Sequence, residues 1–248
     1  MSLEQSFEKQ GNFLFKYRGQ FPLILFLLAI PFIYLSELNN LYSVVSSISY
    51  HILIIIIFIL GFALRCYTIG TTPSGTSGRN TKSQIADTLN TTGIYSILRH
   101  PLYLGNYLIW LSISIYTYSL LFPFIMSLLF WLYYERIMFA EEKFLENKFG
   151  DKFLKWSNLV PAFLPKKLSM SISSVKFSFK SILRREYASY LSAISGLLFI
   201  DIVRGIINND LVHLELSKLI FFLVSMVIVL FLRTLKHYTP LLNEIDRS

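Results

Sequence analysis

Long apolar runs recur along this chain, and short polar stretches separate them. Each run is long enough to cross a bilayer, in some cases only with its interfacial flanks. The runs lie near residues 21–38, 50–70, 101–117, 120–139, 187–204 and 216–232. We therefore predict an all-α, polytopic membrane protein with about six transmembrane helices. The first 20 residues carry charges before any long apolar run, unlike a cleavable signal peptide, so the first span is expected to stay in the protein.

The composition excludes an ordinary soluble domain. Of the 248 residues, 54% are hydrophobic and only 15% are charged, and the mean hydropathy is +0.53. Lys and Arg concentrate on every second connection between spans, while the alternate connections are nearly bare. By the positive-inside rule, both termini and the polar clusters described below face the cytoplasm. A bacterial inner membrane is our expectation, and the same alternation fits an endoplasmic reticulum equally well.

The net charge of +8 follows from this topology and from attraction to anionic lipid headgroups. We therefore expect membrane lipids, and no nucleic acid, as partners, and we leave the oligomeric state open. Cys66 is the only cysteine, and the four histidines are scattered along the chain. A structural zinc site needs several thiolates or imidazoles, so no metal is expected.

The third and fourth spans form a hairpin with its turn near Ser119. From that turn the apolar run extends about 19 residues in each direction, roughly 28 Å of helix, which matches the hydrocarbon core. The hairpin therefore brings Arg99 and His100 to the same membrane face as Glu141 and Glu142. Two clusters of opposite sign at one membrane boundary favour a polar ligand site.

Neighbouring positions support a site at this place. Pro101 suits a first helical turn, because the amide that proline lacks would be unpaired there, and Gly105 allows a ligand or a helix to approach closely. The fourth span is expected to continue as a helix into the cytoplasm, and two prolines make residues 160–165 an extended segment that can lie along a ligand. The loop over residues 71–92 is either an anion-binding nest around Arg79 or a flexible segment carrying orienting charge, with a short helix around Ser83 to Leu89.

Three regions follow from this pattern. Residues 1–89 hold the first two spans and the loop, and residues 90–168 hold the hairpin with its cytoplasmic extension. Residues 169–248 hold a surface-lying helix, predicted from three basic residues at four-residue spacing, followed by the last two spans. Asp201 and Arg204, three residues apart, are expected to form an ion pair.

Four motifs in the middle region resemble the isoprenylcysteine carboxyl methyltransferase and phospholipid methyltransferase superfamily in order and spacing. They are Thr92-Gly93-Ile94-Tyr95, Arg99-His100-Pro101-Leu102-Tyr103-Leu104-Gly105, Glu141-Glu142 with Leu145 and Phe149-Gly150, and Val160-Pro161-Ala162-Phe163-Leu164-Pro165. The resemblance covers roughly residues 90–165. This chain departs from the family's pattern at Ala162, where Arg is frequent, and at Phe153 and Trp156, where Tyr is common.

Members of that superfamily are multi-span membrane enzymes that bind S-adenosylmethionine in a cytoplasm-facing pocket and methylate acceptors presented from the bilayer. The resemblance implies cofactor-binding roles for Tyr95, His100, Pro101, Tyr103, Leu104, Gly105, Glu141, Glu142, Val160 and Pro161. The two glutamates would accept hydrogen bonds from ribose hydroxyls or the ammonium of the cofactor. His100 and the backbone amides near the start of the third span would hold its carboxylate.

The type of acceptor decides which further residues would act in catalysis. A phosphate or carboxylate arrives already anionic and needs no dedicated base, so Arg99, Arg136 and Arg79 are the candidates for steering it. An amine would instead lose its proton to Glu135 or Glu142.

A lipid phosphate is the first choice of acceptor, because the loop before the hairpin is basic and rich in glycine. Residues 75–93 also show a weaker resemblance to a bacterial branch of the superfamily that includes lipid A phosphate methyltransferases. Phospholipid amines and prenylcysteine carboxylates are the next alternatives. A sterol-reductase-like membrane enzyme that uses NADPH is a further one. A transporter or scaffold is disfavoured, since four of the spans lack central ionisable residues.

Overall fold

The computed structural model describes residues 2–41, 45, 47–76, 84, 86–167, 169–209 and 215–244. Every regular secondary-structure element among these residues is a helix, which confirms the predicted all-α class. The helices are α1 (Leu3–Lys16), α2 (Phe21–Leu38), α4 (Ile48–Gly70), the 3-10 helix η1 (Gly93–Ser96), α5 (Pro101–Ile115), α6 (Leu121–Phe149), α7 (Asp151–Leu159), α8 (Phe179–Ile207) and α9 (Leu216–Tyr238).

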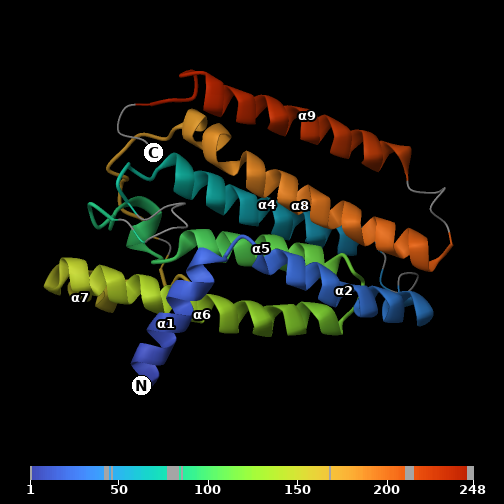
Figure 1. The fold of residues 1–248 in the computed structure, drawn as a ribbon, viewed down its shortest axis with the longest axis horizontal. Coiled ribbons are helices and arrows are strands. Elements are labelled where there is room, and N and C mark those ends of the chain that lie inside the picture. Colours follow the sequence, from blue (N-terminus) through green and yellow to red (C-terminus); the bar gives the residue numbers. More distant parts are fainter. Residues whose placement is uncertain are drawn as a thin grey trace.

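The six predicted apolar helices are all present. Helices α4, α6, α8 and α9 are long and apolar enough to cross a membrane, and α2 and α5 are shorter apolar helices. All six run side by side along the long axis of the molecule (Figure 1). The chain is therefore an integral membrane protein with several spans.

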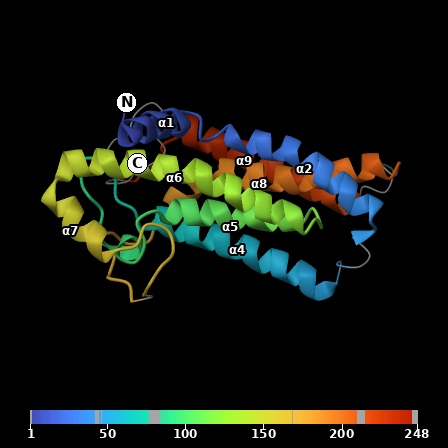
Figure 2. The same ribbon diagram turned by 90° about the horizontal axis from the view of Figure 1, so that it is seen from below.

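Helices α1, η1 and α7 and the segment after α9 lie at one end of the bundle, which we call the site end (Figures 1 and 2). Helix α6 reaches this end because it continues to Phe149, ten residues beyond the predicted span, as the sequence led us to expect. It stops at Gly150, whose φ of +52° lies in the region that favours glycine. The α5–α6 turn, at the predicted position, lies at the opposite end, the far end.

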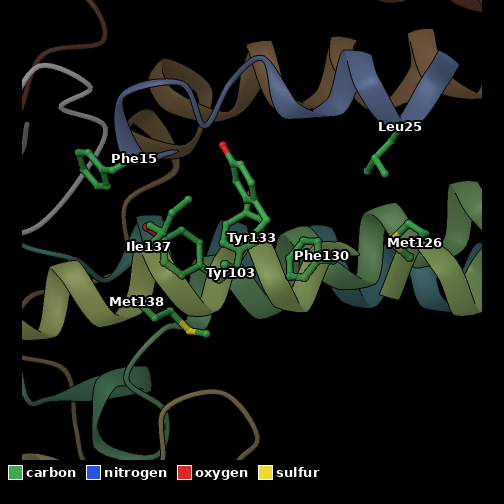
Figure 3. Close-up of a cluster of buried hydrophobic side chains, with 9 residues drawn as sticks. Phe15, Leu25, Tyr103, Met126, Phe130, Tyr133, Ile137 and Met138 are labelled. Carbon is green, nitrogen blue, oxygen red and sulfur yellow. The ribbon is translucent and has the colours of Figure 1, made fainter. Parts of the chain in front are cut away.

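Helix α1 was not predicted as a separate element, and it packs along α6. Phe15 of α1 joins a buried cluster with Tyr133 and Ile137 of α6 (Figure 3). Gly11 makes the approach possible, because a Cβ there would lie 2.0 Å from the backbone oxygen of Arg136. This contact fixes the residues that follow α1 at the site end.

Helices α4 and α5 also approach closely through glycine. A Cβ on Gly105 would lie 3.0 Å from the carbonyl oxygen of Gly61 and 2.5 Å from Cγ of Arg65. Of the two partners expected for Gly105, the structure therefore shows the neighbouring helix. The absence of a side chain at Gly105 gives the stem of Arg65 its place between the helices.

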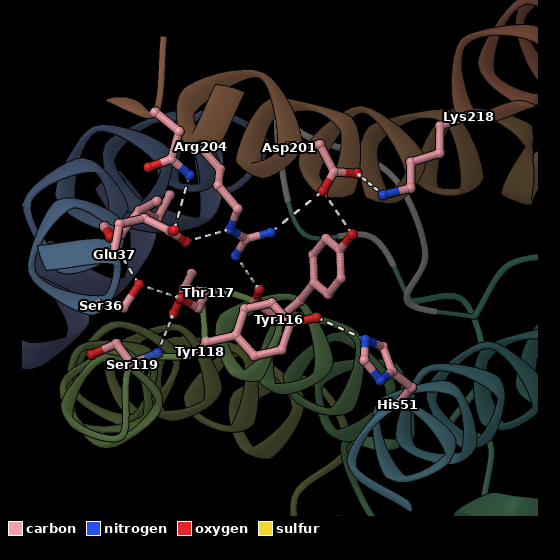
Figure 4. A network of polar contacts seen from close by, with 12 residues as sticks. Ser36, Glu37, His51, Tyr116, Thr117, Tyr118, Ser119, Asp201, Arg204 and Lys218 are labelled. Atoms are coloured by element: carbon pink, nitrogen blue, oxygen red, sulfur yellow. Dashed lines mark hydrogen bonds and ion pairs between the residues drawn. The ribbon is translucent and has the colours of Figure 1, made fainter. Parts of the chain in front are cut away.

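A polar network closes the far end (Figure 4). The predicted ion pair between Arg204 and Asp201 is present at 3.5 Å, but the closer partner of Arg204 is Glu37 of α2, at 2.7 Å from Nε. Tyr116 donates from its hydroxyl to Asp201, and Lys218 of α9 lies 3.4 Å from the same carboxylate. The network therefore joins α2, α8 and α9 to the hairpin turn.

Two local predictions were wrong. The surface-lying helix is not a separate element, because Ser178 caps the N-terminus of α8 and one uninterrupted helix runs from Phe179 to Ile207. The basic residues expected to define it lie partly before α8 and partly in its first turns. In the loop, residues 84 and 86–89 are not helical, and the rest of the short predicted helix lies outside the described residues.

Candidate active site

The base of the α5–α6 hairpin brings the predicted basic and acidic clusters into contact. His100 Nε2 lies 2.7 Å from Glu142 Oε1, and His100 Nδ1 lies 3.6 Å from Glu141 Oε2. Arg99 Nη1 lies 3.1 Å from the second oxygen of Glu142. Two residues just before α5 therefore face two residues near the end of α6.

The extended segment after α7 holds these residues in place. The backbone amides of Arg99 and His100 donate to the carbonyl oxygens of Pro161 and Ala162, both at 3.0 Å. Trp156 Nε1 donates to the carbonyl oxygen of Tyr95 at 3.0 Å. These two amides, at the place where we expected contacts to a cofactor carboxylate, are therefore used within the protein.

The two glutamates favour the protonated form of His100 against the effect of burial. Burial alone would lower the pKa of His100, but the hydrogen bonds and negative charges of Glu141 and Glu142 outweigh it and raise the pKa above 6.5. Burial raises the pKa of Tyr95 to about 12, so its phenol stays neutral. Arg99 Nε is buried, and no atom in the described part of the chain accepts a hydrogen bond from it.

Two adjoining cavities open on this cluster, one of about 450 Å³ and one of about 40 Å³. Their shared lining residues are Tyr95, Arg99, His100 and Glu141. The larger cavity runs between α4, α5 and α8, and the smaller one reaches Glu142 and Trp156. The cluster therefore lies at the junction of the two cavities, where molecules bound on either side of it would approach each other.

Several lining residues of the larger cavity were missed in the sequence. They are Arg18 from the segment after α1, Arg65 from α4, Asn106 from α5, Tyr134 from α6 and Ser189 from α8. Arg18 lies 4.0 Å from Glu141 and stacks on the ring of Phe15. The one available signal was the presence of Arg65 inside an otherwise apolar span.

The structure does not bring all predicted site residues to the cavities. Arg136 pairs with Glu135 at 2.7 Å and stacks on Phe7 of α1, so neither of the two is among the residues that line the two cavities. The reason is that α1 covers this side of α6. Arg79 lies outside the described residues.

The predicted cofactor residues also divide into two groups. Tyr95, His100, Pro101, Tyr103 and Glu141 line the larger cavity, and Glu142 lines the smaller one. Leu104, Gly105, Val160 and Pro161 are not lining residues of either cavity; Gly105 contacts α4, and the segment after Val160 supports the backbone before α5. In the described part of the chain, no group of three or more His, Cys, Asp or Glu side chains is arranged to hold a metal ion.

The region that contains this hairpin is similar to a known protein family. Residues 49–152 match the family model described as phospholipid methyltransferase. This segment of the chain is therefore similar to the phospholipid methyltransferase family. It holds α4, α5 and α6 and therefore most of the cluster, whereas α1, α8 and α9 lie outside it.

Three curated relatives share about 80 residues with the chain. A Cobalt-zinc-cadmium resistance protein of Cupriavidus metallidurans is 38% identical over 32% of this chain and 37% of its own length. The Protein-S-isoprenylcysteine O-methyltransferase of Schizosaccharomyces pombe is 36% identical, over 31% of this chain and 33% of its own length. A Nickel-cobalt-cadmium resistance protein of Alcaligenes xylosoxydans is 35% identical, over 32% and 36%. The matches thus span about a third of each relative, and no solved structure matches significantly.

Proposed function

We propose that the chain is an S-adenosylmethionine-dependent membrane methyltransferase that acts on a lipid-borne acceptor. The observation that carries this proposal is the contact of Arg99 and His100 with Glu141 and Glu142 between two cavities, within the phospholipid methyltransferase segment. The similarity to a Protein-S-isoprenylcysteine O-methyltransferase supports the same chemistry.

The residues at the cluster fit this cofactor. S-adenosylmethionine combines a sulfonium, an ammonium, a carboxylate, a ribose and a flat base, so its pocket needs both charges beside aromatic walls. Glu141 and Glu142 supply negative charge, and Tyr95 and Trp156 supply aromatic surface. The Nε donor of Arg99, which has no acceptor among the described residues, suits a ligand carboxylate. The larger cavity, of about 450 Å³, lies within the range of about 300–1,000 Å³ typical of small-molecule sites, and it offers space for an acceptor beside the cluster.

When bound, S-adenosylmethionine supplies a methyl group on a sulfonium, which an acceptor oxygen takes by in-line displacement while the sulfur keeps the bonding electrons. The chain then has to align the acceptor and exclude water. The ion pairs of Glu142 with Arg99 and His100 hold these three side chains in place where the two cavities adjoin. An anionic acceptor needs no proton acceptor, which agrees with the raised pKa of His100.

We infer that the acceptor is a lipid phosphate, of the lipid A 1-phosphate type, and that phospholipid amines and prenylcysteine carboxylates are the next candidates. Arginine donors at the larger cavity support an anion over an amine. The distribution of Lys and Arg along the sequence supports a cytoplasmic orientation of the site end and a bacterial inner membrane.

The proposal is tested by isothermal titration of the purified protein, in detergent, with S-adenosylmethionine and with NADPH. We expect saturable binding of S-adenosylmethionine and no binding of NADPH; the reverse result would favour the sterol-reductase-like alternative. Mass spectrometry of total lipids, from cells with and without the protein, then identifies the acceptor as the lipid class that gains 14 mass units per methyl group.

A further inference from the structure

A buried ion pair lies beside the larger cavity, away from the hairpin cluster. Arg65 of α4 donates from Nε and Nη2 to the two carboxylate oxygens of Glu186 on α8, both at 2.7 Å. Nη2 also donates to Ser189 at 3.1 Å, and Nη1 donates to Asn106. Asn106 in turn donates to the hydroxyl of Tyr134 at 3.2 Å. Three helices therefore meet at one guanidinium, and α6 joins them through Asn106.

Stability alone does not explain this pair. The side chains of Arg65 and Glu186 are only 8% and 6% exposed, so both charges have lost most of their hydration. Buried ion pairs are often no more stable than apolar side chains of similar volume. Ionisable residues within membrane-spanning helices are costly and generally serve a function.

The pair fixes Arg65 in a direction that points to a ligand. Glu186 occupies one edge of the guanidinium in a two-pronged contact, and this leaves the Nη1 end directed to Asn106. Both Arg65 and Asn106 line the same cavity as His100 and Glu141. Among the described residues, Glu186, Ser189 and Asn106 accept from four of the five N–H groups of Arg65, so an oxyanion would take the remaining N–H of Nη1, beside Asn106. Because the guanidinium is already held in place, binding an oxyanion there would cost little side-chain entropy.

Arg65 does not stand alone as a positive group on this cavity. Arg18 and Arg99 line it too, whereas Glu141 is the one acidic residue among its lining residues in the described part of the chain. Helix α8 faces the same space with small side chains, among them Ala188 and Ser192. The cavity therefore combines guanidinium groups with room between the helices.

We propose that Arg65, positioned by Glu186, binds the oxyanion of the lipid acceptor in the larger cavity. This assignment rests on the methyl transfer proposed above, and it adds a contribution of α8, which lies outside the phospholipid methyltransferase segment. Arg65 is the acceptor-binding residue and Glu186 is a positioning residue. The oxyanion can be a phosphate or a carboxylate.

Three amphiphiles serve as probes with the full chain in detergent and saturating S-adenosylmethionine. Dihexanoyl phosphatidic acid carries a phosphate, dodecanoate carries a carboxylate, and dihexanoylglycerol is uncharged. Arg65→Met combined with Glu186→Leu removes both charges while filling the space, which protects the fold. Arg204→Met combined with Glu37→Leu removes the equally short far-end pair and is the matched control.

We expect wild-type protein to bind one of the two anionic probes at least about tenfold more tightly than the uncharged one. The Arg65/Glu186 variant should lose that preference and keep its affinity for S-adenosylmethionine, and the far-end variant should keep both. Glu186→Gln should raise the KM for the acceptor and leave kcat nearly unchanged, as expected for a residue that orients a binding group.

Preference for dihexanoyl phosphatidic acid would indicate recognition of a phosphate, and preference for dodecanoate would indicate recognition of a carboxylate. An unchanged preference in the Arg65/Glu186 variant, an equal loss in the far-end variant, or wild-type protein without any anion preference would overturn the assignment. Wild-type protein that shows this preference without binding S-adenosylmethionine would refute the proposed function alone.

Discussion

The contact between α1 and α6 gives a prediction that can be worked through quantitatively. Gly11→Ala places a Cβ 2.0 Å from the backbone oxygen of Arg136 and 2.7 Å from Cβ of Ala140. Neither atom is the mobile end of a side chain, so α1 must move away from α6. The ring of Phe15, which is 5% exposed, would move with it, and so would Arg18, which stacks on that ring.

The expected size of the effect follows from two opposing terms. Overpacking of this kind costs about 1–3 kcal/mol, and we take the upper value because backbone is involved. The better helix propensity of alanine returns about 1 kcal/mol. The net cost is therefore about 2 kcal/mol, which corresponds to roughly thirtyfold more frequent opening of α1.

Hydrogen exchange measured by mass spectrometry in detergent checks this value. Amides of α1 should exchange roughly thirtyfold faster in Gly11→Ala, and those of α4 should be unchanged. Gly19→Ala is the matched control, because a Cβ at Gly19 would have no atom within 4 Å. Exchange of α1 within twofold of wild type, or an equal rise in the control, would refute the close packing of α1 on α6.

Two further predictions concern the two ends of the bundle. Glu37→Gln removes the closest charged partner of Arg204 while Asp201 stays at 3.5 Å, so it should lower stability by about 2 kcal/mol, as measured by denaturant unfolding. At the site end, the pKa of His100 is raised by Glu141 and Glu142, so its stabilising contribution is fully present below about pH 6.5 and is lost as the pH rises through the folded pKa. Stability should therefore fall above pH 6.5, and His100→Gln should flatten this dependence; a dependence that persists would exclude His100 as its source.

The hairpin and its polar base were predictable because they depend on local properties. The position of the turn and the lengths of the two apolar runs place His100 and Glu142 at the same level, and the structure has them 2.7 Å apart. The motifs that resemble the methyltransferase superfamily lie within or just beyond the family-matched segment, residues 49–152.

The rest of the site depends on contacts that local patterns do not encode. Arg65 and Glu186 are 121 residues apart in sequence, and nothing in either helix specifies the other as its partner. Arg136 was chosen because a basic residue near a membrane boundary suits an anion, but α1 packs over it and Glu135 neutralises it. A glycine such as Gly11 fits many roles, and only the arrangement of the helices shows that it allows α1 to pack on α6.

We propose that the cluster at the base of the hairpin binds S-adenosylmethionine. Titration of Glu142→Gln with this cofactor tests it most directly, with Glu135→Gln as the matched control, a carboxylate on the same helix that faces neither cavity. Loss of a charged hydrogen-bond partner should lower the affinity for S-adenosylmethionine about ten- to hundredfold in Glu142→Gln. The affinity of Glu135→Gln should equal that of wild type. Unchanged affinity in Glu142→Gln, or an equal loss in both variants, would show that Glu142 does not bind the cofactor.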